Sequence, residues 1–168
     1  TDYTLFLVRH GSICVSVFPV FANNLIQGAL MQHKLPFLQG YSDFASEVKV
    51  KNSRFDFRLE FPEKSAYVEV KSVSLVEQGQ GRFPDAPTER GVRHVKELIE
   101  LCAKGYRTAV VFVSQRSDTG SITCNDDIDP VFGEWLRKAH SQGVELYGMN
   151  CKVTPTTISL NKEVEVVL

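Results

Sequence analysis

The stretch RFDFRLEFPEKSAYVEVKSV, residues 54–73, decides the fold. Polar and apolar residues alternate over residues 54–61 and again over 67–73, with Pro62-Glu-Lys64 between the two runs. Side chains of a β-strand point to alternate faces, so this pattern predicts two strands joined by a turn, each with one apolar and one polar face. The apolar side chains expected to share one face of the first strand are Phe55, Phe57, Leu59 and Phe61.

Further patterns on both sides of this stretch extend the sheet. Residues 108–114 are almost all apolar, which is typical of a central strand buried on both faces. Residues 88–104, and a second segment beginning at Asp129-Pro130, carry apolar residues at helical spacing. The remaining expected elements are a hairpin over 3–18, a short helix capped by Asn23 or Asn24, a loop over 77–87, and strands over 46–51, 144–153 and 157–168. This order predicts an α/β fold, a mixed β-sheet flanked by helices.

Composition narrows the class of protein. The 168 residues suffice for one domain, and 19 Lys and Arg against 20 Asp and Glu give a net charge of -1. This balance excludes a highly basic protein that coats nucleic acid, but it leaves room for a locally basic groove. The four cysteines have no C-x-x-C spacing, which indicates free thiols in a reducing compartment. No apolar run approaches the ~18 residues that span a bilayer, and no cleavable leader is visible. We therefore expect a cytoplasmic protein that makes no membrane contact.

Asp56, Glu69 and Lys71 are the candidates for chemistry. If the two strands pair as a hairpin, all three polar side chains lie side by side on one face. Two neighbouring carboxylates repel each other unless a cation lies between them, and Mg²⁺ or Mn²⁺ would bind there through oxygen ligands, with the Val70 carbonyl as one more. Lys71 could then orient a water molecule for attack on a phosphodiester. The alternative is an exposed strand face with a cross-strand ion pair.

Four blocks of sequence carry a resemblance to a known family: NSRFDF (52–57), YVEVKSV (67–73), FPDAPTERG (83–91) and IDP (128–130). With their spacing, they resemble the sugar fermentation stimulation protein A family (SfsA) from Tyr3 to Leu168. The C-terminal portion of that family is similar to PD-(D/E)xK nucleases, which have a restriction-endonuclease-like core. Family members usually begin with an OB-like barrel. The resemblance therefore implies that residues 1–168 form the nuclease-like domain and that the barrel is absent from this chain.

The same resemblance implies roles for the acidic residues and for the lysine. In its pattern Asp56 and Glu69 are the metal-binding acids, Lys71 is the catalytic lysine, and Glu47 matches an acid that such nucleases often add to the metal shell.

Several other polar residues are candidates for binding nucleic acid. Near the start of the helix over 88–104, a phosphate could meet basic side chains and the helix N-terminus; the alternative is a helix cap with a solvated face. Side chains at the end of the buried strand could contact a phosphate or a base, or only lead into a polar loop. A basic streak on the strands around Asp56 could follow a DNA backbone, or protect an edge strand from aggregation. The residues concerned are Arg90, Arg93 and His94 of the helix, Gln115 and Arg116 of the strand end, and Lys49, Lys51, Arg54 and Arg58 of the streak.

Two functional hypotheses follow. The first is a DNA-binding protein whose metal-dependent, nuclease-like site hydrolyses DNA phosphodiesters. The second is a non-catalytic DNA-binding regulator of sugar (maltose) metabolism genes on a nuclease scaffold. Both make DNA the partner, and both leave open whether the protein is a homodimer. An enzyme acting on small sugars lacks support, because the sequence has neither a Gly-rich phosphate loop nor a nucleophile elbow.

Overall fold

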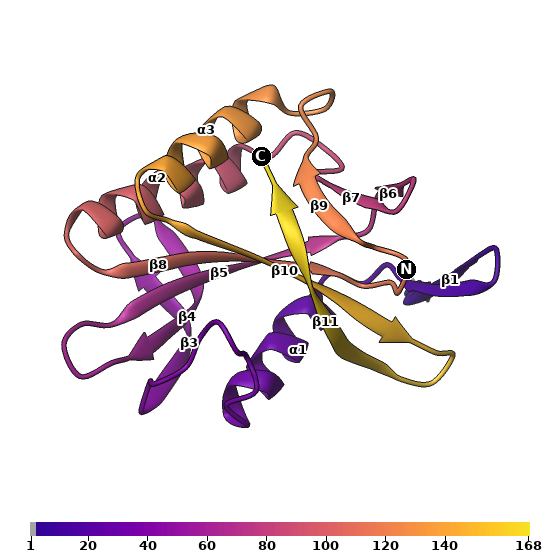
Figure 1. Ribbon diagram of the computed structural model, residues 1–168, viewed down its shortest axis with the longest axis horizontal. Coiled ribbons are helices and arrows are strands. Elements are labelled where there is room, and N and C mark those ends of the chain that lie inside the picture. Colours follow the sequence, from indigo (N-terminus) through magenta and orange to yellow (C-terminus); the bar gives the residue numbers. More distant parts are fainter. Residues whose placement is uncertain (1–2) are drawn as a thin grey trace.

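A nine-stranded mixed sheet forms the centre of the computed structural model, which describes residues 3–168 (Figure 1). The strand order is β3-β4-β5-β8-β10-β11-β9-β7-β6, and β1 and β2 form a separate hairpin. The expected α/β fold with helices flanking a mixed sheet is confirmed. The elements are β1 (Leu7–His10), β2 (Ile13–Ser16), α1 (Val20–Met31), β3 (Asp43–Val50), β4 (Ser53–Glu60), β5 (Ala66–Val73), β6 (Val76–Glu77), β7 (Gln80–Phe83), α2 (Glu89–Ala103), β8 (Arg107–Ser114), β9 (Ser121–Cys124), α3 (Pro130–Ser141), β10 (Glu145–Val153) and β11 (Ile158–Val167).

The helices lie on both faces of the sheet. In Figure 1, α1 covers one face, and α2 and α3 lie together on the other. The apolar side chains form two corresponding clusters, one with Ile26 and Leu30 of α1 and one with Leu98 of α2 and Leu136 of α3. The predicted central strand is β8, which pairs in parallel with β5 and β10 and is buried from Thr108 onward. Because helices cover the sheet on both sides of β8, almost all of its residues are buried, which explains its apolar run.

Three local expectations were wrong. The first helix begins at Val20 with Pro19 before it, so Asn23 lies inside the helix and does not cap it. The expected loop over 77–87 contains the short strands β6 and β7, and β9 was not expected at all. These strands have two to four residues each, which is too short for a periodic pattern to reveal.

Strand β4 pairs with β3 along its whole length but with β5 over only part of it. It pairs with β5 only from Phe57 to Leu59, and its ladder with β5 includes no residue before Phe57. Phe57 packs in the cluster under α1, whereas Phe55 packs in the cluster under α2 and α3. The expectation that these two rings share one face was wrong, because β4 rotates where it leaves β5. Asp56 lies at this rotation, beside a stretch of β5 that has no ladder partner on that side.

Two further expectations concern the whole chain. Cys14, Cys102, Cys124 and Cys151 are all free. Within residues 3–168, no helix combines the length and the apolar character needed to cross a membrane.

Candidate metal and phosphodiester site

Asp56 is held in the opening between β4 and β5 by two hydrogen bonds. The backbone N–H of Val70 donates to Oδ2 at 2.7 Å, where a fully paired β4 would place a carbonyl group. Asn23 Nδ2, from the first turns of α1, donates to Oδ1 at 2.7 Å. The carboxylate is therefore oriented by a strand and a helix that are far apart in the sequence.

Glu69 is buried beside this opening, with 3% of its surface exposed. Its Oε1 atom accepts a hydrogen bond from Lys71 Nζ at 2.7 Å and lies 2.5 Å from Nδ1 of the buried His94 in α2. Its Oε2 atom is buried and has no hydrogen-bond partner among the described residues. An unsatisfied buried carboxylate oxygen costs on the order of 1–3 kcal/mol or more, so it marks a place where a further ligand would be stabilising.

The two carboxylates are perturbed in opposite directions. Burial, together with the negative charge of Glu69, raises the pKa of Asp56 from 3.8 to about 6. Burial also acts to raise the pKa of Glu69, but the hydrogen bond with His94 and the charge of Lys71 outweigh it and lower that pKa. Two acids whose pKa values are pushed apart in one opening are typical of a functional site.

The structure therefore brings together the three residues on which the sequence prediction centred: Asp56, Glu69 and Lys71. Within residues 3–168, no group of three or more His, Cys, Asp or Glu side chains is arranged to hold a metal ion. A bound Mg²⁺ or Mn²⁺ would take other oxygen ligands as well, and Mg²⁺ usually keeps several water molecules in such sites.

The sequence interpretation missed the roles of Asn23 and His94. The sequence predicts a helix cap at Asn23 or Asn24 and a nucleic-acid contact at His94. His94 is 1% exposed, so it is placed to hold Glu69 and not to meet a ligand from solvent. Its burial could have been inferred from the spacing, because His94 lies next to Val95 and four residues before Leu98 on the apolar stripe of α2.

Gln115 and Arg116 also lie in the interior, with 0% and 6% exposure. The Gln115 amide accepts from Ser16 Oγ at 2.8 Å and donates to Ser72 Oγ at 2.8 Å. The Arg116 guanidinium donates twice to Asp118, at 2.6 and 2.7 Å. Both side chains are therefore buried and held by contacts inside the protein, whereas the sequence predicts that they contact a phosphate or a base.

The remaining predicted contacts are on the surface. Four basic residues are exposed and accessible to a polyanion: Lys49, Arg54, Arg90 and Arg93. Glu47, the predicted additional acid, is exposed on β3 and pairs with Arg54 at 3.2 Å. It is not joined to Asp56 or Glu69 in this arrangement.

Comparison with known proteins gives consistent results. The family model described as "Sugar fermentation stimulation protein RE domain" matches residues 20–157. A sugar fermentation stimulation protein homolog from Clostridium perfringens strain SM101 is 40% identical over all of this chain and 74% of its own length. The homolog from Moorella thermoacetica is 42% identical over 95% of this chain and 69% of its own length. A solved structure described as SfsA from Pyrococcus furiosus in complex with Ca²⁺ superimposes with a TM-score of 0.92 at 27% identity, over 99% of this chain and 72% of that one.

Proposed function

Since this chain belongs to the sugar fermentation stimulation protein family, we propose that its Asp56–Glu69–Lys71 cluster is a divalent-metal site that hydrolyses phosphodiester bonds of DNA. The observation that carries this proposal is the buried Oε2 atom of Glu69, which has no hydrogen-bond partner among the described residues. Glu69 also lies close enough to Asp56 for its negative charge to help raise the pKa of Asp56. A divalent cation would satisfy both acids, which supports a metal site at this position.

The backbone supports the same ligand set. In a β-strand, the N–H and C=O groups of one residue point to the same side. The Val70 N–H points toward Asp56, so the Val70 carbonyl is also directed into the opening left by β4. Asp56, Glu69 and the Val70 carbonyl would then offer three oxygen ligands, which fit Mg²⁺ or Mn²⁺. The Pyrococcus furiosus relative described with Ca²⁺ supports a preference for oxygen-bound cations.

Each residue of the cluster has a separate task in this proposal. Asn23 and the Val70 N–H orient Asp56, and His94 orients Glu69. Lys71 lies 12% exposed at the edge of the cluster, where its ammonium group can position a water molecule and stabilise negative charge on the phosphate. When bound, the metal ion would supply Lewis-acid stabilisation of that charge and lower the pKa of a bound water.

The test is cleavage of supercoiled plasmid and of a single-stranded oligonucleotide in the presence of Mn²⁺ or Mg²⁺. We expect Lys71→Met to keep Mn²⁺ binding in calorimetry but to lose cleavage by about 10²-fold or more. Asp56→Asn should lose both. Lys34→Met, an exposed lysine without an ion pair among the described residues, is the matched control.

Cleavage that is unchanged in the Lys71 variant contradicts the assignment. DNA binding by the wild type without any metal-dependent cleavage would instead support a non-catalytic DNA-binding regulator on this scaffold.

A further inference from the structure

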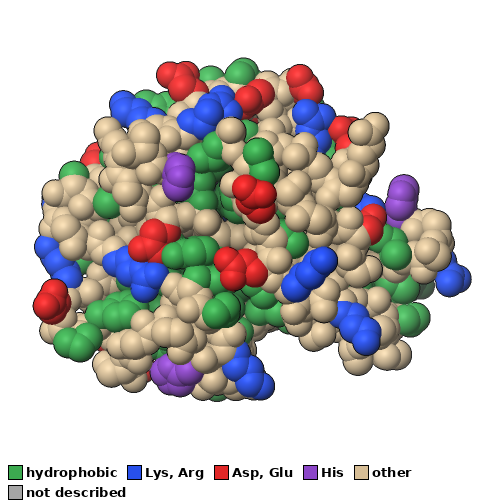
Figure 2. All heavy atoms as spheres, viewed as in Figure 1, with side chains coloured by type: hydrophobic (Ala, Val, Ile, Leu, Met, Phe, Trp, Pro, Cys, Tyr) green, Lys and Arg blue, Asp and Glu red, His purple; other side chains and the backbone are tan. Residues whose placement is uncertain are grey.

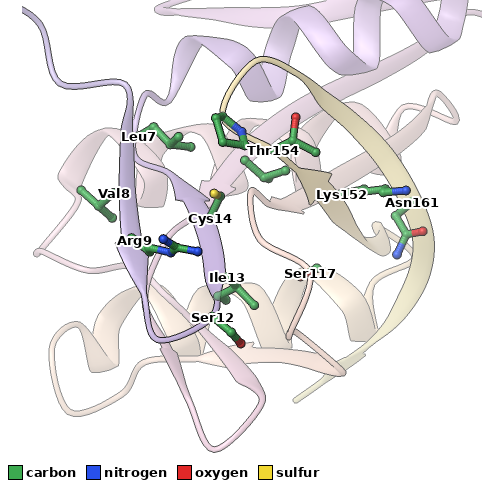
Figure 3. A pocket seen from close by; sticks show the side chains of 12 residues that line it. Leu7, Val8, Arg9, Ser12, Ile13, Cys14, Ser117, Lys152, Thr154 and Asn161 are labelled. Carbon is green, nitrogen blue, oxygen red and sulfur yellow. The ribbon is translucent and has the colours of Figure 1, made fainter.

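A groove runs between the β1–β2 hairpin and the strands β10 and β11. Its main part is a cavity of about 840 Å³ (Figure 3). A second cavity of about 250 Å³ continues it toward α1, because the two share Leu7, Val153, Thr154 and Pro155 as lining residues. We call these two cavities together the hairpin groove.

The charged residues that line the hairpin groove are all basic. Arg9 of β1 and Lys152 of β10 line opposite walls, and no Asp or Glu of the described residues lines either cavity. Neither side chain forms a salt bridge within residues 3–168, and the exposed hydroxyls of Ser12 and Ser117 lie between the walls as further hydrogen-bond donors. Figure 2 shows basic side chains over this part of the surface, where β10 and β11 approach the hairpin. In a protein of net charge -1, this local excess favours an anionic ligand.

The end of the groove next to α1 is aromatic. Phe6, Phe18 and Phe21 form a cluster with ring centroids 4.8 to 5.7 Å apart. Phe6 and Phe21 line the smaller cavity, and 46% of the Phe6 surface is exposed. An exposed aromatic ring beside a basic groove is the arrangement that binds single-stranded nucleic acid, because bases stack on the ring while cations meet the phosphates.

Two elements that line the groove, α1 and β2, also take part in contacts that lead to the metal site. Phe21 lies two residues before Asn23, whose amide holds Asp56. On the hairpin side, Ser16 is hydrogen bonded to Gln115, and Gln115 is hydrogen bonded to Ser72, the neighbour of Lys71. These contacts fix the walls of the groove relative to the metal site.

We propose that the hairpin groove binds single-stranded nucleic acid, with phosphates on Arg9 and Lys152 and a base stacked on Phe6. This inference rests on the proposed function and deepens it by naming the form of the substrate. Stacking on Phe6 requires an unpaired base, so the groove selects a single strand over a duplex.

The test measures binding of a labelled oligothymidylate by fluorescence anisotropy in EDTA, over a range of salt concentrations. A length of about 20 nucleotides is enough to fill a single-strand site. The logarithm of the binding constant falls linearly with the logarithm of the salt concentration, and we call the gradient of this line the salt slope. The double variant Arg9→Gln/Lys152→Gln loses two phosphate contacts, so the magnitude of its salt slope should be about 1.4 smaller than that of the wild type. Phe6→Ala should bind at least about fivefold more weakly with an unchanged slope, because it removes stacking but no charge. Lys34→Gln/Lys104→Gln removes the same charge from exposed positions outside the groove and should bind as the wild type does.

A second measurement uses two cysteines of the same chain and needs no substitution. Cys14 lines the groove and Cys102 lies on α2, and both are half-buried. The oligonucleotide should slow alkylation of Cys14 but not of Cys102, whereas a duplex of the same length should protect neither.

The proposal is overturned if the wild type does not bind the oligonucleotide, if it prefers the duplex, or if the Arg9/Lys152 variant binds with the wild-type slope. Because binding is measured without metal, this outcome is separate from catalysis. Metal-dependent hydrolysis of bis(4-nitrophenyl) phosphate, which is too small to need the groove, reports on the catalytic site alone.

Discussion

Asp56→Asn provides a quantitative test of the metal site, because it removes the carboxylate charge and keeps the shape of the side chain. The oxygen of the substituted amide can still accept from the Val70 N–H, and its NH₂ group can pair with a rotated Asn23 amide. The variant should therefore fold as the wild type does and differ mainly in electrostatics. In EDTA, the free energy of unfolding of the two proteins should depend differently on pH.

The direction and size of this difference follow from the pKa of Asp56. Its value of about 6 in the folded protein lies above the ordinary 3.8, so the folded protein binds the proton more tightly than the unfolded chain. Protonation of Asp56 thus stabilises the fold; the contribution is complete below about pH 4 and is lost as the pH rises through about 6. Between pH 8 and pH 5, the wild type should gain about 1.4 kcal/mol relative to the variant.

The assay is urea unfolding of both proteins at about pH 8, 7, 6 and 5, which brackets the titration of Asp56. Titrating groups far from Asp56 are common to both proteins and cancel in the difference, and the pKa of the neighbouring Glu69 is lowered, so Glu69 stays ionised over this pH range. With Mn²⁺ at the highest pH, only the wild type should gain stability, because the metal binds the folded state. A difference between the two proteins that stays constant across this pH range would refute the reasoning about Asp56.

Two further predictions concern contacts away from the Asp56 carboxylate. His94→Ala should lower the free energy of unfolding by about 2 kcal/mol and weaken Mn²⁺ binding, because buried Glu69 loses its hydrogen-bond partner in α2. Urea unfolding measures the first effect and calorimetry the second. An unchanged Mn²⁺ affinity would show that His94 does not position Glu69. Gly148→Ala should destabilise the fold by roughly 1–3 kcal/mol, since the added Cβ atom would lie 2.6 Å from the Val164 carbonyl oxygen. Gly28→Ala should instead stabilise α1 by about 0.5–1 kcal/mol, because nothing lies within 4 Å of the added Cβ atom. Urea unfolding measures both effects.

The sequence predicts those parts of the fold whose signal is local. Alternation over residues 54–61 and 67–73 places β4 and β5 within one residue of their observed bounds, and the apolar run over 108–114 identifies β8. Strands β6, β7 and β9 escape prediction because they are too short for a periodic pattern. In addition, β7 and β9 are stabilised by pairing with each other although they are far apart in the sequence.

In the candidate site too, only contacts between residues close in the sequence can be predicted. Glu69 and Lys71 are two residues apart on one strand, so their proximity can be read from the sequence. Asn23 is 33 residues from Asp56, and His94 is 25 residues from Glu69, so nothing local reveals these contacts. The interior position of Gln115 has the same cause, because its partner Ser16 is 99 residues away.

The hydrogen bond between the Val70 N–H and Asp56 also makes one backbone amide an observable for the whole site. Any event that changes the charge on this carboxylate, whether protonation near pH 6 or cation binding, will alter the polarisation of that single N–H group. In a ¹⁵N-labelled sample, the Val70 resonance should therefore report occupancy of the site under conditions in which no substrate is present and no turnover occurs.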